Sequence, residues 1–195
     1  KFKVNMISGV PFIYEMLKKL KIDKKNFPYL KVFTQAGGGM EKETLKYFQD
    51  YTLKKNISFY TMYGATESTS RMSFLKPNFF LKKTGSIGKP LLGGKFYLVD
   101  ENNIPINKIK KTGELVYSGK NVFAGYASNL NDLKDIQSNK TYYTGDLAMR
   151  DKDGFYYIVG RKKRIVKFFG INYNLEDIER FLKKKSILTN CEKID

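Results

Sequence analysis

Four polar side chains follow one another directly after an aromatic, β-prone run. The run FYTMYG ends at Gly64, and Thr66, Glu67, Ser68 and Thr69 come next. Hydroxyl groups beside one carboxylate can hold a phosphate group and its metal ion, because Mg2+ prefers hard oxygen ligands. The same residue types also suit an ordinary polar turn. This stretch alone therefore leaves both interpretations open.

A second acidic residue stands in the stretch YYTGDLAMRDKDGFYYIVGRKKRIVKFFG. Asp146 follows a glycine between two strand-like runs, and Arg161 opens a segment with five basic residues that ends at Lys167. A carboxylate in such basic surroundings can form a structural salt bridge. It can equally accept two hydrogen bonds from a ribose diol, as acidic residues do in dinucleotide-binding folds.

The elements that would position Glu67 follow an α/β rhythm. A short strand at 30–35 runs into a glycine turn, a helical composition follows at 41–56, and an aromatic strand comes at 57–64. This order indicates a βαβ layer. The stretch 11–20 begins with proline and predicts a helix that packs its apolar face on the sheet, the face being Phe12, Ile13, Met16, Leu17 and Leu20.

From Gly85 onward the pattern changes to short strands separated by turn residues. KFYLVDENNIP, GELVYSG and DKDGFYYIVG have strand character, and Asp153 with Gly154 is a strong hairpin signal. We expect a compact β unit of roughly 75 residues here. Asn174 and Asp177 form a weak capping box that predicts a final helix. The fold class is therefore α/β plus β.

The composition is that of a globular protein with a strong positive charge. Of the 195 residues, 42% are hydrophobic, and the formal net charge is +17 at pH 7. The excess is nearly all lysine in scattered pairs and triplets, which indicates solvated faces and attraction to a polyanionic ligand. Nucleic acid is disfavoured as a partner, because the five arginines are dispersed rather than gathered with aromatic residues.

The sequence also limits redox chemistry, metals and location. One cysteine, Cys191, excludes an intramolecular disulfide, and the absence of histidine excludes a His/Cys zinc site. No run reaches the roughly 18 apolar residues of a membrane span, so a cytoplasmic protein is expected. Because the chain starts at Lys1 without methionine and stops soon after a helix-like segment, we expect a fragment of something longer.

Ordered motifs along the chain carry a family resemblance. The segments are MYGATE, GSIGKP, GELVYSGKNVFAGY, YYTGD and VGRKKRIVKFFG, followed by INYNLEDIERFL. They resemble the YGxTE, GSxGxP, GELxxxGxxxxxGY, TGD and GRxKxxIKxxG motifs and the IxPxEIE helix of the adenylate-forming superfamily. That superfamily includes acyl-CoA synthetases, nonribosomal peptide synthetase adenylation domains and luciferase. The stretch YGATESTSRMSFLKP is most similar to a bacterial subgroup of AMP-forming acid ligases.

This resemblance implies the rear part of a large adenylate-forming domain and the start of a small one. It places an α/β portion at 1–84, a small distorted β-barrel at 85–162, and the hinge with the beginning of a C-terminal α+β domain at 163–195. The family's phosphate-binding loop has no counterpart here. LTNCEKID faintly resembles the motif of the family's C-terminal catalytic lysine, but it lies too close to Lys163, so we expect Lys193 to be a surface lysine.

The resemblance implies a nucleotide site. Tyr63, next to Gly64, would stack on adenine, and the turn that approaches the adenine would be Gly37, Gly38 and Gly39. Thr66 would donate its hydroxyl to phosphate, and Glu67 would bind Mg2+. Asp146 would hold both ribose hydroxyls with help from Arg161.

The remaining implied roles concern transfer of the acyl group to a thiol and binding of the acid substrate. Lys163 would be the hinge of the small domain, although a plain surface lysine is the competing interpretation. Lys167 would be a catalytic basic residue facing pyrophosphate or the thiol substrate. The candidates for the acid pocket are Thr34, Ala36, Ser70 and Arg71, and Arg71 would pair either with an acidic substrate group or with the fold.

The implied activity is AMP-forming ligation of a carboxylic acid. ATP and Mg2+ would convert the acid to an acyl-adenylate and pyrophosphate, and the acyl group would pass to a thiol of coenzyme A or of a carrier protein's phosphopantetheine. This fragment alone is expected to be inactive. The alternative is a degenerate or truncated homologue that binds nucleotide or a partner without catalysis. Damaged motifs would favour it, whereas Thr66, Glu67, Asp146 and Arg161 are all present.

Overall fold

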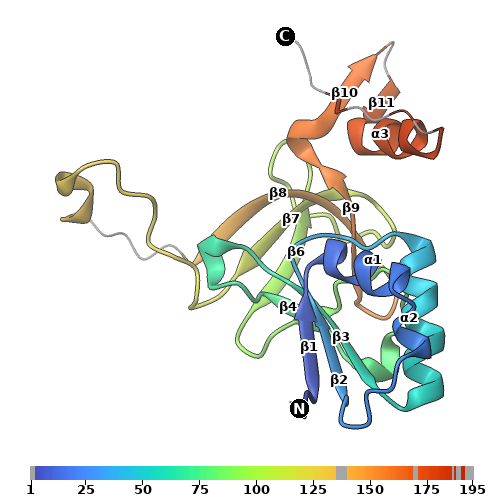
Figure 1. Ribbon diagram of the computed structural model, residues 1–195. Coiled ribbons are helices and arrows are strands. Elements are labelled where there is room, and N and C mark those ends of the chain that lie inside the picture. The colour runs from blue at the N-terminus through green and yellow to red at the C-terminus, as the bar shows by residue number, and fades with distance from the viewer. Residues whose placement is uncertain (1–2, 135–139, 169–170, 186, 188–189, 192–195) are drawn as a thin grey trace.

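The computed structural model describes residues 3–134, 140–168, 171–185, 187 and 190–191 (Figure 1). Its first sheet has the order β1–β2–β3–β4–β5, with β1 (Met6–Gly9), β2 (Val32–Gln35), β3 (Ser58–Tyr63), β4 (Ser73–Leu75) and β5 (Lys89–Pro90). The strands β1, β2 and β3 are parallel, and β4 and β5 continue the sheet in antiparallel pairing. Because β2 and β3 are parallel, the loops that follow them leave the same edge of the sheet.

Two helices lie on the same side of this sheet (Figure 1). They are α1 (Pro11–Lys19) and α2 (Lys42–Lys55). The core between helices and sheet is aromatic: Tyr14 from α1 and Phe48 from α2 pack against Phe33 and Phe59, and none of the four is more than 1% exposed. The predicted βαβ layer is therefore present.

Much of the predicted apolar face of α1 is exposed instead of packed on the sheet. Phe12 is 61% exposed and Leu20 is 66% exposed, whereas Tyr14 is fully buried. Tyr14 can be the buried residue because its ring packs edge-on against Phe48 and its hydroxyl donates a 2.6 Å hydrogen bond to the carbonyl of Thr34. Its polar hydroxyl therefore has a partner inside the core. Leu17, from the predicted face, is partly buried and packs against this core.

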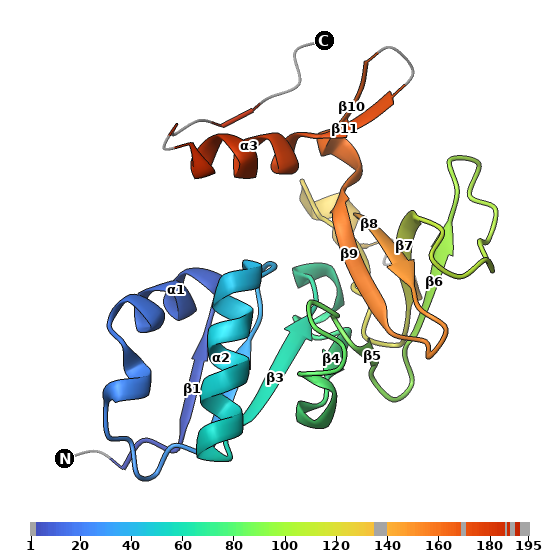
Figure 2. The same ribbon diagram turned by 90° about the vertical axis from the view of Figure 1, so that its right-hand side faces the viewer.

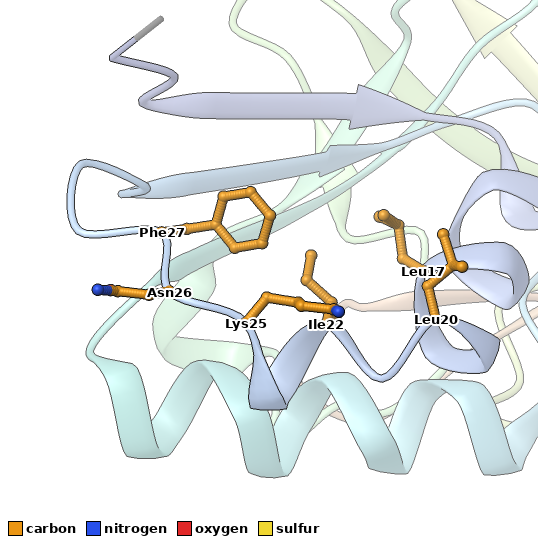
Figure 3. Close-up of a pocket in the computed structure, with 6 residues that line it drawn as sticks. All are labelled: Leu17, Leu20, Ile22, Lys25, Asn26 and Phe27. Carbon is orange, nitrogen blue, oxygen red and sulfur yellow. The ribbon is translucent and has the colours of Figure 1, made fainter. Parts of the chain in front are cut away.

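An apolar hollow of about 400 Å³ lies beside α1 and the 3-10 helix η1 (Ile22–Lys24). Figure 3 shows its lining residues, which are Leu17, Leu20, Ile22, Lys25, Asn26 and Phe27. None of the site residues expected from the sequence lines it. The hollow is therefore separate from the polar site developed below.

The second sheet is antiparallel and has the order β6–β7–β8–β9. Its strands are β6 (Lys95–Val99), β7 (Gly113–Ser118), β8 (Thr141–Arg150) and β9 (Tyr156–Arg161). A second core lies under it, built from residues such as Met72, Leu98, Leu115, Tyr117 and Tyr156. The expected β unit is thus a twisted four-stranded sheet in the described part of the chain, and Asp153 and Gly154 form the β8–β9 turn.

The motif YYTGD lies inside β8, whereas the sequence pattern predicts Asp146 between strands. The difference arises because β8 stays paired with β7 on both sides of a break in register. Glu114 pairs with Leu147 and Val116 pairs with Tyr143, so a step of two residues on β7 corresponds to four residues on β8. The backbone bends here at Gly145, whose φ is +70°. A glycine and a local irregularity look like a loop in sequence, yet the strand continues through them.

The two sheets pack on one another through the β8–β9 hairpin. Phe155 is buried in the first core. The Ser86 hydroxyl donates a 2.8 Å hydrogen bond to the carbonyl of Tyr156. Lys83 lies 2.6 Å from Asp151, so a basic side chain of the first half also holds the hairpin. These contacts fix the edge of the first sheet against the second.

The chain beyond β9 forms a small unit that stands apart from the two sheets (Figure 2). It consists of the 3-10 helix η5 (Lys162–Arg164), the hairpin β10 (Ile165–Phe168) and β11 (Ile171–Asn174), and α3 (Leu175–Lys184). Arg164 and Glu179 form an ion pair of 2.6 Å within this unit. The remaining 3-10 turns are η2 (Thr66–Ser68), η3 (Pro77–Phe79) and η4 (Leu130–Leu133). No helix in the described ranges is long and apolar enough to cross a membrane.

Candidate active site

Asp146 lies where the two sheets meet, and both of its carboxylate oxygens have partners. The Tyr63 hydroxyl donates to Oδ2 at 2.6 Å, and Arg161 Nε lies 3.1 Å from Oδ1. Asp146 and Arg161 are directly opposite in the β8–β9 ladder, so the backbone register sets this ion pair. The side chain of Asp146 is 9% exposed and that of Arg161 is 67% exposed. The carboxylate of Asp146 is thus buried, and the guanidinium of Arg161 that pairs with it lies at the surface.

Tyr63 ends β3 and joins the first sheet to the second. Its ring contacts that of Phe96 on β6 at 6.2 Å between centroids, in an edge-on arrangement. Burial, followed by the negative charge of Asp146, raises the pKa of Tyr63. The phenol therefore stays protonated and acts as a hydrogen-bond donor to Asp146.

Gly64 is required by the loop that carries Glu67. A Cβ at this position would lie 2.1 Å from the carbonyl oxygen of Ser70, a backbone atom that cannot move aside cheaply. The chain returns over Gly64 because the amide of Ser70 donates a 3.0 Å hydrogen bond to the carbonyl of Ala65. The aromatic strand stops at a glycine so that η2 can fold back onto its end.

Glu67 lies in η2 and is bound by a second loop. Its backbone carbonyl accepts a 2.8 Å hydrogen bond from the amide of Phe123, and the hydroxyl of Tyr126 donates to its carboxylate. This hydrogen bond from Tyr126 holds the pKa of Glu67 below its ordinary value. The Glu67 carboxylate is therefore ionised at neutral pH, in a partly exposed position.

The negative charges of both carboxylates act on Tyr142. Burial raises the pKa of Tyr142 to about 12, and Glu67 and Asp146 both contribute to this shift through their negative charges. The pKa of this one phenol on β8 is therefore raised by both acids. Asn121 strengthens the assembly, because its amide donates a 2.7 Å hydrogen bond to the carbonyl of Ser68.

The structure places the other expected phosphate and adenine residues at the same sheet edge. Thr66 is exposed in η2, and its hydroxyl has no hydrogen-bond partner within the described residues. The turn of Gly37, Gly38 and Gly39 lies in the loop between β2 and α2 and is exposed. The parallel pairing of β2 with β3 brings this turn and the Gly64 loop to one edge.

The acid-pocket candidates lie at the end of β2 and in the loop that follows β3. The Thr34 hydroxyl on β2 donates a 2.7 Å hydrogen bond to the hydroxyl of Ser8, and Ala36 follows the end of β2. Ser70 and Arg71 follow η2, before β4. Arg71 is exposed, and it forms no ion pair with any residue in the part of the chain that the structure describes.

Lys163 and Lys167, to which the sequence assigns roles, lie outside this cluster. Lys163 is exposed in η5, at the junction between β9 and β10. Lys167 is opposite Asn172 in the β10–β11 hairpin, and its side chain is outside the described part of the structure. Lys193 lies outside the described residues altogether.

Two site residues receive no role from the sequence. Tyr126, which binds Glu67, and Glu114, a buried acid beside Gly145, both stand in the segment GELVYSGKNVFAGY. The segment itself is the available signal. Their contacts are made with residues far away in sequence, after β7 and the loop that follows it have folded. The spacing of the motif does not predict these contacts.

The residues present fit a nucleotide with its metal rather than a metal held by protein alone. Among the described residues, no group of three acidic, cysteine or histidine side chains could hold a metal ion. One ionised carboxylate, Glu67, is what Mg2+ needs when phosphate oxygens and water supply its other ligands.

Comparisons with known proteins show which family the chain belongs to. A model of the AMP-binding enzyme family matches residues 1–127. The 2-succinylbenzoate–CoA ligase of Oceanobacillus iheyensis is 31% identical over 180 residues, which are 92% of this chain and 36% of that protein.

Solved structures of the o-succinylbenzoate CoA synthetase of Bacillus subtilis are similar as well. One, in complex with an acyl-adenylate intermediate, has a TM-score of 0.76 and 25% identity and covers 93% of this chain and 36% of that one. Another, with ATP and magnesium ion, has a TM-score of 0.76 and 24% identity and covers 96% of this chain and 38% of that one. The chain thus spans little more than a third of these relatives, and the expected α/β plus β fold is confirmed. This chain belongs to the AMP-binding enzyme family, the adenylate-forming enzymes that its motifs resemble.

Proposed function

We propose that this chain is part of an ATP-dependent, AMP-forming ligase that activates a carboxylic acid. The proposed reaction joins the acid to the α-phosphate of ATP, releases pyrophosphate, and then passes the acyl group from the acyl-adenylate to a thiol. The observation that carries the proposal is the set of contacts that hold Asp146 and Glu67. Asp146 is buried between a phenol and a guanidinium, while Glu67 is ionised and partly exposed.

Asp146 has the capacity to hold a ribose. An ionised carboxylate offers about four lone-pair sites. Tyr63 and Arg161 use two of them, so two remain for the hydroxyls of a ribose diol. The Tyr63 ring would supply a flat face for adenine, and the turn of Gly37, Gly38 and Gly39 would border the base.

Glu67 and Thr66 would serve the phosphate side. Thr66 offers an exposed hydroxyl without a partner in the described residues, and Glu67 offers an ionised carboxylate. When bound, Mg2+ neutralises charge on the phosphates of ATP. The o-succinylbenzoate CoA synthetase of Bacillus subtilis has been solved in complex with ATP and magnesium ion, which supports the same ligands here.

The acid would lie against the loops that follow β2 and β3. Thr34, Ala36, Ser70 and Arg71 are the candidates, and the lack of an ion pair for Arg71 within the described residues favours its pairing with an acidic group of the substrate. The relatives named for 2-succinylbenzoate act on an acid with two carboxyl groups, which fits this assignment.

The small unit beyond β9 would carry the second half-reaction. We assign the hinge to Lys163, because it lies in η5 at the junction of the second sheet with β10, and a basic catalytic role to Lys167. We also propose that the chain divides into an α/β portion at 1–84, a β portion at 85–162 and the start of a C-terminal domain at 163–195. The acceptor in this proposal is the thiol of coenzyme A or of a carrier protein.

A cytoplasmic location is also proposed, because a single cysteine is typical of proteins in a reducing compartment.

Acid-dependent exchange of pyrophosphate into ATP tests the proposal. The complete protein that carries this chain should catalyse the exchange with a carboxylic acid and should release AMP when a thiol is added. The 195-residue chain alone should not, because it has few groups for the charge that develops in the transition state. Hydrolysis of ATP to ADP by the complete protein would contradict the proposal, whereas exchange by the isolated chain would contradict only its expected inactivity.

A further inference from the structure

Glu114 is a buried acid that the proposed chemistry does not use. It lies on β7 and is 7% exposed. A buried carboxylate is costly unless both oxygens find partners. Oε1 accepts a 3.2 Å hydrogen bond from the amide of Gly145, and Oε2 lies 2.7 Å from Lys162 Nζ. Both oxygens of Glu114 are therefore engaged, and their partners indicate what the side chain does.

Those partners are the chain neighbours of the two residues that pair at the site. Gly145 precedes Asp146 on β8, and Lys162 follows Arg161 after β9. The Asp146–Arg161 ion pair is thus enclosed by a second pair of contacts, both made to one side chain. A shift of Glu114 would move the backbone of Gly145 on one side of the ion pair and the side chain of Lys162 on the other.

The backbone at this point depends on side chains for its conformation. The β7–β8 register breaks between Glu114 and Val116, so regular ladder hydrogen bonds do not fix Gly145, whose φ is +70°. Side chains replace them. The Thr144 hydroxyl donates to the carbonyl of Leu115 at 2.8 Å, and Glu114 accepts from the amide of Gly145. The Asp146 amide also donates a 3.1 Å hydrogen bond to the Thr144 hydroxyl, so Thr144 and Glu114 together hold the bend that aims Asp146.

We propose that Glu114 is a positioning residue that sets the orientation of Asp146 toward the ribose by holding Gly145 and Lys162. This inference rests on the proposed function, because it takes Asp146 as the group that binds the ribose hydroxyls. Glu114 itself does not touch the nucleotide. Its effect should therefore appear only in interactions that pass through Asp146.

Comparison of AMP with 2′-deoxy-AMP separates positioning from a general structural role. The unchanged complete protein should bind AMP about tenfold or more tightly than the deoxynucleotide, because one hydroxyl donates to a charged acceptor. Glu114→Leu, which removes both contacts at similar size, should weaken AMP binding and reduce the preference to below about threefold. Glu114→Gln keeps an acceptor for Gly145 and should retain most of the preference. Isothermal titration calorimetry gives the affinities needed.

Controls make the result decisive. Glu101→Gln changes an exposed acid in a turn and should leave the preference unchanged. If Glu114→Leu loses its circular dichroism spectrum, Lys162→Met replaces it and should lower the preference at least about threefold, whereas Lys152→Met at an exposed position should not. A wild-type preference in both Glu114→Leu and Lys162→Met would overturn the inference. Equal affinity of the unchanged protein for the two nucleotides would instead contradict the ribose role of Asp146.

Discussion

The Tyr63 hydroxyl donates a 2.6 Å hydrogen bond to Asp146 across 83 positions of sequence. This bond joins the end of β3 to the middle of β8, so the proposed adenine platform and the proposed ribose carboxylate are fixed relative to each other. Any nucleotide bound here meets both at once.

The first prediction separates the ring of Tyr63 from its hydroxyl. Tyr63→Phe keeps the aromatic face and frees one oxygen of Asp146, so the Kd for AMP should change by less than about threefold. Tyr63→Leu removes the face and should weaken binding by about tenfold or more, because stacking of a base on an aromatic ring contributes on the order of 1–3 kcal/mol. Calorimetry on the complete protein measures both. Equal losses in the two variants would show that the hydroxyl, through its bond to Asp146, determines the affinity and that the ring does not.

The second prediction concerns Glu67 and magnesium. Glu67→Gln removes the charge but keeps the size, so adenylation should slow and the loss should be partly relieved at high Mg2+. The measurement is the rate of pyrophosphate exchange across a series of Mg2+ concentrations. Asp50→Asn, at an exposed position on α2, is a matched control that should leave the Mg2+ dependence unchanged. A defect in Glu67→Gln that is independent of Mg2+ would remove the metal assignment.

The third prediction tests the contact between Tyr126 and Glu67. The pKa of Glu67 is lowered in the folded protein chiefly by this hydrogen bond, so the carboxylate favours folding above its unfolded pKa, and this contribution is lost as pH falls through the folded pKa. Tyr126→Phe should therefore raise the pKa of Glu67 toward its ordinary value. NMR titration of the Glu67 side-chain carbon measures the change. Tyr143→Phe, at an exposed tyrosine, should have no effect; an unchanged pKa in Tyr126→Phe would disprove the contact.

The fourth prediction addresses the hinge at Lys163. Proline fixes φ near −65° and removes an amide donor, so Lys163→Pro should spare adenylation and block transfer to the thiol. Lys163→Ala keeps the backbone freedom and should leave both steps intact. Single-turnover assays of acyl-adenylate formation and thioester formation distinguish them. Equal slowing of both steps by proline, or slowing of neither, would show that rotation does not occur at this residue.

Much of the fold follows from the sequence, because periodicity reports which side of an element is buried. The sequence pattern predicts helices at 11–20 and 41–56 and a strand at 57–64, and the observed elements are Pro11–Lys19, Lys42–Lys55 and Ser58–Tyr63. It does not predict the buried face of α1. The spacing of leucine and phenylalanine favours one side, but the hydroxyl of Tyr14 finds the carbonyl of Thr34, and that contact exists only in the folded core.

The site can be predicted from the sequence only where a motif names the residue. Motifs name Asp146, Glu67 and Tyr63, and the structure brings them around Tyr142 and β8. The supporting contacts of Glu114 and Tyr126 are beyond such prediction, because a break in strand register and the course of a long loop place them. Spacing along the chain carries no information on either.

The most direct test of the central claim is the dependence of pyrophosphate exchange on ATP in the Asp146→Ala variant of the complete protein. Two hydrogen bonds from ribose to a charged acceptor are removed, so the KM for ATP should rise by about tenfold or more while the KM for the acid stays the same. Asp132→Ala, at an exposed acid in η4, provides the control. An unchanged KM for ATP in Asp146→Ala would contradict the assignment of Asp146 to the ribose and the proposed nucleotide site with it.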